Sequence, residues 1–401
     1  MPEKGKPRAL LAAGGTGGHM FPAQALSEEL GRMGWQCAMI TDARGRKHAG
    51  RIQADPIIEV KAASISPRRP VQALRGSLQL AQGVRQAKAF MRDWQPDVVV
   101  GFGGYPSFPA LRAAEGLNIP RVIHEQNAVL GRVNRVFARK ATVVASGFED
   151  LAKLPVGANH VVVGNPLRDS LLNAARSLSF SLEGEGARRA DEGVRQMVTP
   201  STLQPSNTLT RPSGAPSPLR ERDIELLIVG GSLGANILSD VIPPAIAALP
   251  DDLRRQVNVT QQVTESRRTA ATDTYAAADI PATLDAFFSD IHDHLANADL
   301  IIARAGASSV AEIALMGLPS ILVPLGIAMD DHQTANAKAL ERLGAAVILP
   351  ESGFTPDALT ELLTELLRDP ERLDQMGRSA QSLARPDAAR DLAALVVQAA
   401  Q

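Results

Sequence analysis

The sequence predicts an α/β protein built from two doubly wound, parallel-sheet domains. The chain has 401 residues, more than a single domain usually holds, and its 45% hydrophobic residues can fill two cores. Short apolar runs of strand type recur in both halves, and many end in a glycine turn followed by helical spacing. Ligands of such sheets bind at the carboxyl ends of the strands, so these turns are the candidate sites.

Composition narrows the class of protein. The single cysteine, Cys37, excludes an internal disulfide and points to a reducing compartment. No apolar run approaches the length of a membrane span, and the apolar segment near the start is too short for a signal peptide. We therefore expect a cytoplasmic protein.

Charge is distributed unevenly along the chain. Residues 1–163 hold 22 Lys and Arg against 12 Asp and Glu, a net +10, and the remainder carries a net −11. The basic half is expected to face an anionic partner, either a phosphate-bearing substrate or an anionic membrane surface. Nucleic acid is not expected, because no binding motif is present and only 3% of the residues are aromatic.

One strand-to-helix turn in the second half indicates a nucleotide site. The strand-type run 298–303 leads into Gly306, and helical spacing follows from Ser309 to Met316. Such a turn presents free backbone N–H groups at a helix N-terminus, where the helix dipole also favours a phosphate. Glu312, about one turn further in, can accept hydrogen bonds from two ribose hydroxyls. The alternative is an ordinary βα turn with a solvated Glu312.

The first half opens on a second turn of this kind. A predicted strand at 8–13 is followed by the glycine loop 14–19 and by a helix expected to start near Pro22. The dinucleotide fingerprint fails, because Met20 occupies its last glycine position. The loop is interpreted as an anion-binding turn that carries an imidazole, His19, at its exit. His19 either exchanges a proton or caps the helix.

Two further strands of the first half end in polar or glycine-rich turns. These are the stretches 96–106, which contains three glycines, and 121–134, which contains His124, Glu125 and Asn127. Because parallel strands end at one edge of a sheet, the three strand ends of this half predict one cleft.

The helix expected before 96–106, which follows the basic, proline-punctuated loop 62–75, has an apolar stripe and a basic stripe. The apolar stripe is expected to pack in the core, and the basic one either faces solvent or rests on anionic lipid. The apolar residues are Leu80, Val84, Ala87, Met91 and Trp94, and the basic ones are Arg85, Lys88 and Arg92.

After a low-complexity segment, the rest of the chain again alternates predicted strands and helices. Residues 171–222 are rich in Ser, Thr, Pro and Gly, so we expect a largely disordered interdomain segment. Strands are then expected at 224–229, 257–262, 282–288 and 320–324, with helices at 334–343 and from 355 onward, broken near 386.

Six motifs in this order carry a resemblance. The chain resembles the MurG family of GT-B glycosyltransferases, which add N-acetylglucosamine to lipid I in peptidoglycan synthesis. The resemblance covers most of the chain apart from 171–222. The motifs are Gly14–His19, Gly101–Pro106, His124–Asn127, Gly164–Pro166, Gly230–Ala235 and Asp330–Asn336.

This resemblance implies an architecture and a reaction. The fold would be GT-B, with two Rossmann-like domains facing across a cleft: an acceptor and membrane-side domain at 1–168 and a UDP-sugar domain at 223–380. Residues 381–401 would form a helix that packs back on the first domain. The reaction would be inverting, without a cofactor or a required metal, and would give lipid II.

The same resemblance implies partners and a location. The donor would be UDP-N-acetylglucosamine and the acceptor an undecaprenyl-diphosphate-linked sugar peptide. The enzyme would be peripheral on the cytoplasmic face of the plasma membrane, among proteins of cell-wall synthesis or division.

Site residues are carried over to matching positions. His19 is the candidate base, with His124 and Glu125 as alternatives. Residues implied to contact the donor are Thr16, Gly17, Gly18, Asn127, Arg168, Ser232, Phe288, Ala307, Ser308, Ser309, Val310, Ala311, Glu312 and Gln333. Leu233 stands where the family usually has Gln, and the segment 171–222 is much longer than usual.

The chemistry is consistent with these residues. Displacement at an anomeric carbon needs a base for the acceptor hydroxyl and a group that stabilises the departing pyrophosphate. An imidazole suits the first need, and a helix N-terminus aided by Arg168 suits the second. The alternatives are another GT-B enzyme, such as a lipid glucosyltransferase or a nucleotide-sugar epimerase, and a non-catalytic binding module.

Overall fold

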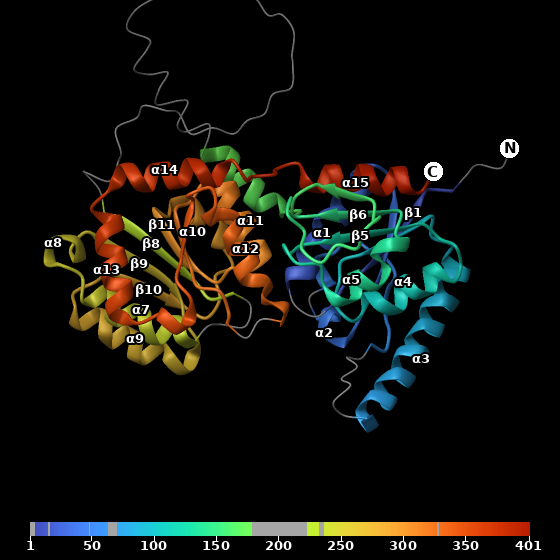
Figure 1. Cartoon of the computed structure of the whole chain (residues 1–401), viewed down its shortest axis with the longest axis horizontal. Coiled ribbons are helices and arrows are strands. Elements are labelled where there is room, and N and C mark those ends of the chain that lie inside the picture. Colours follow the sequence, from blue (N-terminus) through green and yellow to red (C-terminus); the bar gives the residue numbers. More distant parts are fainter. Residues whose placement is uncertain are drawn as a thin grey trace, which may run out of the picture.

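The protein consists of two α/β domains that lie side by side (Figure 1). The computed structural model describes residues 5–14, 17–47, 49–62, 70–178, 223–231, 236–326 and 329–401. Each domain is built on one parallel sheet, with a hydrophobic cluster on either face. The predicted pair of doubly wound domains is confirmed.

The first sheet has seven strands in the order β3-β2-β1-β4-β5-β6-β7. Ala9 and Leu11 of β1 belong to one cluster and Leu10 and Ala12 to the other, which explains the unbroken apolar run. The strands are β1 Arg8–Ala12, β2 Gln36–Thr41, β3 Ile57–Glu59, β4 Val98–Gly101, β5 Arg121–Glu125, β6 Val143–Ser146 and β7 His160–Val162.

Helices cover both faces of this sheet. They are α1 Gly17–Arg32, α2 Ala43–Arg46, α3 Pro70–Trp94, α4 Ser107–Glu115 and α5 Arg132–Phe137, with 3-10 turns at Ala49–Arg51 and Ala138–Lys140. The predicted start of the first helix near Pro22 is wrong, because α1 already begins at Gly17. Packing of Met20 and Ala23 against the sheet extends the helix into the glycine loop despite the low helix propensity of glycine.

The second sheet has six strands in the order β10-β9-β8-β11-β12-β13. Both sheets therefore place their first and fourth strands side by side, at the switch point where ligands of doubly wound sheets bind. The strands are β8 Ile224–Val229, β9 Val257–Gln262, β10 Ala282–Asp285, β11 Leu300–Ala303, β12 Ser320–Leu322 and β13 Ala346–Ile348.

The helices of the second half alternate with its strands, as expected. They are α7 Asn236–Ala247, α8 Asp251–Arg254, α9 Glu265–Ala277, α10 Ile291–Asn297, α11 Ala307–Met316, α12 His332–Glu341, α13 Pro356–Leu367, α14 Pro370–Gln381 and α15 Ala388–Ala399, with 3-10 turns at Met329–Asp331 and Glu351–Gly353. The continuous helix expected from 355 onward has an additional break at Asp369, whose side chain caps α14 by accepting from the Arg372 N–H.

The predicted interdomain segment begins too early. Residues 169–178 are helical, and Leu171 and Ala175 are buried in a cluster with α11. These two residues are four apart, so they share one helix face, and their burial makes the helix part of the fold. Residues 179–222, the remainder of the predicted segment, lie outside the described residues.

The last helix returns to the first domain. Leu392, Ala393 and Val396 of α15 are fully buried in the cluster that contains β1 and α1. Figure 1 shows α14 over the second domain and α15 over the first, so the chain crosses the junction twice. No helix among the described residues is long and apolar enough to cross a membrane.

Shortening a buried side chain of α15 should destabilise the first domain. Leu392→Ala is expected to lower the free energy of unfolding by about 2–5 kcal/mol, since the side chain is fully buried and leaves a cavity. Urea denaturation measures this loss. Leu78→Ala removes the same atoms at a site that is 65% exposed and is the control; an equal effect of both would contradict the packing of α15.

Candidate active site at the domain junction

Turns at the ends of β1 and β4 meet directly. A Cβ atom on Gly14 would collide with Pro106, and Ser107 Oγ lies 2.6 Å from the carbonyl oxygens of both Ala12 and Gly103, which share its single proton. Gly103 has a φ of +86°, a backbone conformation that favours glycine. The expected convergence of these strand ends is therefore present in the structure.

His19 lies against this double turn. A Cβ atom on Gly103 would lie 3.4 Å from His19 Cε1, and one on Gly104 would lie 3.4 Å from Cδ2. The imidazole is partly exposed, and its Nδ1 atom lies 2.9 Å from Gln126 Oε1, beyond the end of β5. Three strand ends thus contribute to one site.

His124 is much more enclosed than His19. It is fully buried, with Nδ1 at 3.0 Å from Gln126 Nε2 and Nε2 at 3.0 Å from the Gly164 carbonyl oxygen. Burial lowers the pKa of His124 to about 4, so it is neutral at pH 7. Both of its nitrogens are engaged within the protein.

Glu125 organises the loop that follows β5. Its carboxylate is 2% exposed and accepts hydrogen bonds from the Asn127 backbone and side chain at 3.1 Å each. The Gly131 N–H and the Asn134 side chain donate to its other oxygen at 2.8 Å each. Four donors saturate this carboxylate and fix the backbone between β5 and α5.

Asn336 joins this loop to the second domain. Its fully buried amide accepts from the Ala128 N–H at 2.8 Å and donates to Asn127 Oδ1 and the Ala305 carbonyl at 3.1 Å each. Asn127, a predicted donor contact, therefore lies where the two domains meet.

The turn before α11 has the geometry expected of a phosphate site. Gly306 is extended, and the first helical hydrogen bond runs from the Val310 N–H to its carbonyl at 2.9 Å. The N–H groups of Ala307, Ser308 and Ser309 therefore precede the helical ladder. Ser308, Ser309 and Ala311 are partly exposed. The Val310 side chain is 1% exposed and packs in the core, so only its backbone is available to a ligand in this turn.

Glu312 and Arg168 meet across the junction. Arg168 Nη2 lies 3.8 Å from Glu312 Oε1, and the guanidinium carbon lies 4.5 Å from the centre of the Phe21 ring in α1. Burial raises the pKa of Glu312 to about 7, and the Arg168 charge opposes this shift. The Glu312 side chain is 16% exposed, so a ligand can still reach it.

The other predicted contacts are more scattered. The Phe288 ring packs edge-on against His294, and Gln333 Oε1 accepts from the Leu325 N–H at 2.9 Å. Gly17 and Gly18 lie in the first turn of α1, where Gly18 is exposed. Thr16, Ser232 and Leu233 lie outside the described residues.

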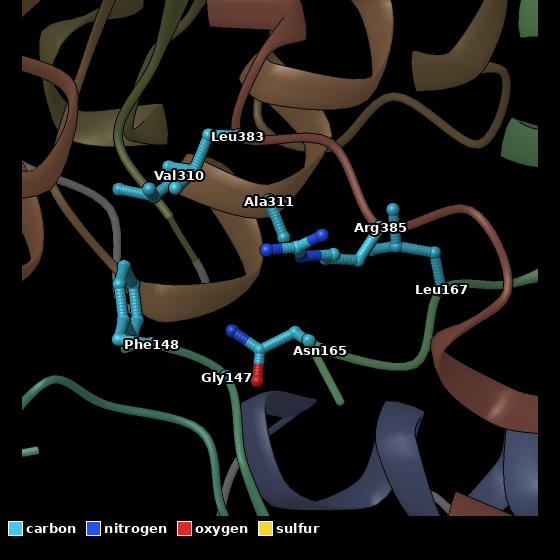
Figure 2. A pocket seen from close by; sticks show the side chains of 9 residues that line it. Gly147, Phe148, Asn165, Leu167, Val310, Ala311, Leu383 and Arg385 are labelled. Carbon is cyan, nitrogen blue, oxygen red and sulfur yellow. The ribbon is translucent and has the colours of Figure 1, made fainter. Parts of the chain in front are cut away.

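Sequence reasoning did not assign Asn165 to the site. Its amide donates to the Gln126 carbonyl at 3.0 Å and to the Ala307 carbonyl at 3.4 Å, so it links the two domains. It lines a small pocket at the junction with Phe148, Leu167, Val310 and Arg385 (Figure 2). The Gly164–Pro166 motif was the only signal.

Asp330 was also missed. It accepts from Lys153 at 2.7 Å and lies 3.4 Å from Arg135 and 3.7 Å from Arg132, all three in the first domain. The Lys153 hydrogen bond is the main cause that lowers the pKa of Asp330. The Asp330–Asn336 motif and the opposite net charges of the two halves were the available signals. Among the described residues, no group of three or more His, Cys, Asp or Glu could hold a metal ion.

Comparison with known families decides the class of this site. The model of the glycosyltransferase family 28 N-terminal domain matches residues 9–146, and that of the C-terminal domain matches residues 225–392. The chain belongs to glycosyltransferase family 28. The predicted GT-B fold and the glycosyltransferase class are thereby confirmed.

Relatives within family 28 match nearly the whole chain. The UDP-N-acetylglucosamine--N-acetylmuramyl-(pentapeptide) pyrophosphoryl-undecaprenol N-acetylglucosamine transferase of Maricaulis maris is 44% identical, over 97% of this chain and 96% of that protein. The enzyme of the same name from Rhodospirillum centenum is 42% identical, over 98% and 94%.

Solved structures agree with this assignment. The crystal structure of Acinetobacter baumannii MurG matches with a TM-score of 0.73 and 30% identity, over 98% of this chain and 99% of that one. A UDP-GlcNAc 2-epimerase from Neisseria meningitidis matches with a TM-score of 0.63 and 13% identity, over 98% of this chain and 100% of that one. At that identity the second match shows the fold alone.

The raised pKa of Glu312 predicts a pH-dependent stability. Its folded-state pKa of about 7 exceeds the usual glutamate value, so ionisation of Glu312 destabilises the fold as pH rises toward and through 7. Glu312→Gln should therefore raise Tm more at pH 8 than at pH 5. Glu365→Gln, at a side chain that is 60% exposed, is the control. A pH-independent difference for Glu312→Gln would contradict the raised pKa.

Proposed function

We infer that this family 28 enzyme transfers N-acetylglucosamine from UDP-N-acetylglucosamine to lipid I, undecaprenyl-pyrophosphoryl-N-acetylmuramyl-pentapeptide, giving lipid II. The observation that carries this inference is the 42–44% sequence identity, over nearly the whole chain, to transferases of that name. The geometry supports it, because His19 of one domain and the α11 turn of the other both lie at the junction.

His19 is the proposed general base. It would take the proton of the acceptor hydroxyl as that oxygen attacks the anomeric carbon of the donor sugar with inversion. Its partial exposure beside the glycine turns supports this role. The alternatives have the wrong surroundings: His124 is fully buried with both nitrogens engaged, and Glu125 is saturated by four donors.

The α11 turn and Arg168 are proposed to bind the donor diphosphate and to stabilise the departing UDP. The N–H groups of Ala307 to Ser309 point out of the helix start, where the helix dipole stabilises negative charge. Arg168 of the first domain lies beside Glu312 of α11 and supplies a full positive charge. Glu312 would accept the ribose hydroxyls.

A direct assay tests this function. Purified protein is incubated with radiolabelled UDP-N-acetylglucosamine and lipid I, and label is expected in the lipid fraction together with release of UDP. Transfer to diacylglycerol would indicate a lipid glycosyltransferase instead. Interconversion of the UDP-sugar with exchange of solvent hydrogen in the absence of acceptor would indicate an epimerase.

Removal of the proposed base should affect the chemical step. His19→Ala is expected to lower kcat by roughly 10²–10⁴-fold and to leave the Kd of UDP-N-acetylglucosamine unchanged, because a base acts in the transition state. Steady-state kinetics and calorimetry measure the two quantities. A loss mainly in the acceptor KM would assign His19 to acceptor binding, and a near-normal kcat would reject it as the base.

Removal of Glu312, the residue proposed to bind the ribose, should weaken donor binding. Glu312→Ala is expected to weaken UDP binding by about 1.5–3 kcal/mol, the range for hydrogen bonds to a charged group. Calorimetry at pH 8, where Glu312 is largely ionised, gives the clearest comparison. Glu365→Ala is the control, and an unchanged affinity of Glu312→Ala would reject the assignment.

We further propose that the first domain rests on an anionic membrane through α3. Arg85 and Arg92 of this helix are exposed, and Lys88 is partly exposed. Leu78, earlier in α3, is 65% exposed and supplies an apolar contact. The apolar stripe is largely used elsewhere, because Ala87 and Met91 are buried in the core. The net +10 of residues 1–163 favours binding of this domain to an anionic surface.

Charge removal on α3 tests this orientation. Arg85→Ala, Lys88→Ala and Arg92→Ala together should weaken binding to vesicles containing anionic lipid by up to about 3 kcal/mol, at roughly 1 kcal/mol for each cation. Vesicle co-sedimentation at low and high salt measures this. The matched control removes Arg267, Arg372 and Arg378 of the second domain, and equal losses in both triple variants would contradict the proposal.

A further inference from the structure

We propose that Gln126 is a positioning residue that sets the tautomer of His19, leaving Nε2 as its unprotonated, basic nitrogen. This proposal rests on the proposed role of His19 as the base. Gln126 is 2% exposed, lies one residue beyond β5 and contacts both histidines of the site. One chain of hydrogen bonds runs from the Gly164 carbonyl through His124 and Gln126 to His19.

The chain of hydrogen bonds begins at the Gly164 carbonyl, which can only accept. The Gly164 carbonyl is an acceptor only, so His124 Nε2, 3.0 Å away, must be the donor. His124 is fully buried and neutral at pH 7, because burial lowers its pKa to about 4. A neutral imidazole carries one proton, so His124 Nδ1 is an acceptor.

This acceptor fixes the orientation of the Gln126 amide. Gln126 Nε2 lies 3.0 Å from His124 Nδ1 and 3.2 Å from the His124 carbonyl oxygen. Exchanging the amide nitrogen and oxygen would place Oε1 against two acceptors inside the protein, with no proton between them. The amide nitrogen therefore faces His124, and Oε1 faces His19.

His19 must then donate through Nδ1. The distance from Nδ1 to Gln126 Oε1 is 2.9 Å, and an amide oxygen can only accept. The neutral imidazole consequently has its lone pair on Nε2. Within the described part of the chain, no hydrogen bond to Nε2 is present. Close approach of Gly103 and Gly104 to the ring holds its plane, so the basic nitrogen has a defined direction.

Gly164 also connects His19 to the segment between α14 and α15, where the chain passes from the second domain to the first. Gly164 has a φ of +90°, and a side chain at this position would collide with Arg385 and approach Ala388 at 3.2 Å. The backbone that carries this carbonyl thus packs directly against the segment that enters α15. The tautomer of His19 depends on tertiary contacts as well as on its own loop.

Nitrogen-15 NMR of histidine-labelled protein tests the tautomer directly. The spectrum is recorded at alkaline pH, where imidazoles are neutral, and the His19 signals are identified by their loss in His19→Gln. The wild-type protein is expected to show a protonated Nδ1 and an unprotonated Nε2 for His19. Because this measurement needs no variant of Gln126, it decides the proposal even if such a variant fails to fold.

Removing the amide should change the tautomer and the rate together. Gln126→Met is expected to shift His19 toward the tautomer protonated on Nε2 and to lower kcat by roughly 10- to 100-fold, with an unchanged Kd for UDP-N-acetylglucosamine. Gln261→Met is the matched control, since Gln261 is fully buried in the second domain and bonds to Tyr275 at 2.6 Å. The control should keep both the His19 spectrum and kcat.

The outcomes separate this proposal from the base assignment. A wild-type His19 protonated on Nε2, or a Gln126→Met protein with an unchanged His19 spectrum, overturns the role of Gln126. If His19→Ala keeps a near-normal kcat while the spectra behave as expected, the positioning by Gln126 stands and the base lies elsewhere. A Gln261→Met protein with the same kcat loss as Gln126→Met would assign the loss to general destabilisation and overturn the catalytic part.

Discussion

The buried amide of Asn336 is the interaction on which the geometry of the junction depends. Its oxygen accepts from the Ala128 N–H, and its nitrogen donates to Asn127 Oδ1, both in the first domain. The same nitrogen also donates to the Ala305 carbonyl in the second domain. An unpaired buried polar group costs about 1–3 kcal/mol, so separating the loops would be unfavourable at both ends. The loop after β5 and the turn before α11 are thus held in one register at the domain junction.

Charge contributes to the junction in a different way. The first half is basic and the second acidic, and Asp330 meets Lys153, Arg135 and Arg132 across the gap. Exposed ion pairs stabilise a protein little, so this cluster mainly orients the domains. Arg168 and Glu312 are more enclosed and lie where the donor is expected. Their charges are therefore available to the proposed donor as well as to the fold.

Three polar residues that look equivalent in the sequence differ in the folded protein. His19 lies shortly after β1, His124 and Glu125 are the last two residues of β5, and no spacing rule ranks them as bases. The structure separates them by burial and by partners: His124 is enclosed, Glu125 is saturated, and His19 retains one nitrogen without a partner among the described residues. The sequence did not single out Gln126, because its proposed role depends on the orientation of its side-chain amide. Only its contacts with His124 and His19 determine that orientation.

The sequence by itself determined the two parallel-sheet domains and the edge that carries the site. Its apolar runs predicted strands such as β11, observed at Leu300–Ala303 with all four residues buried, because burial on both faces requires such runs. It also located the glycine turns, since few residues adopt their backbone conformations. Only the tertiary structure decided the start of α1, the helix at 169–178, and the partners of Arg168 and Asn336. Those features depend on contacts between residues far apart in the chain, which local propensity and periodicity do not encode.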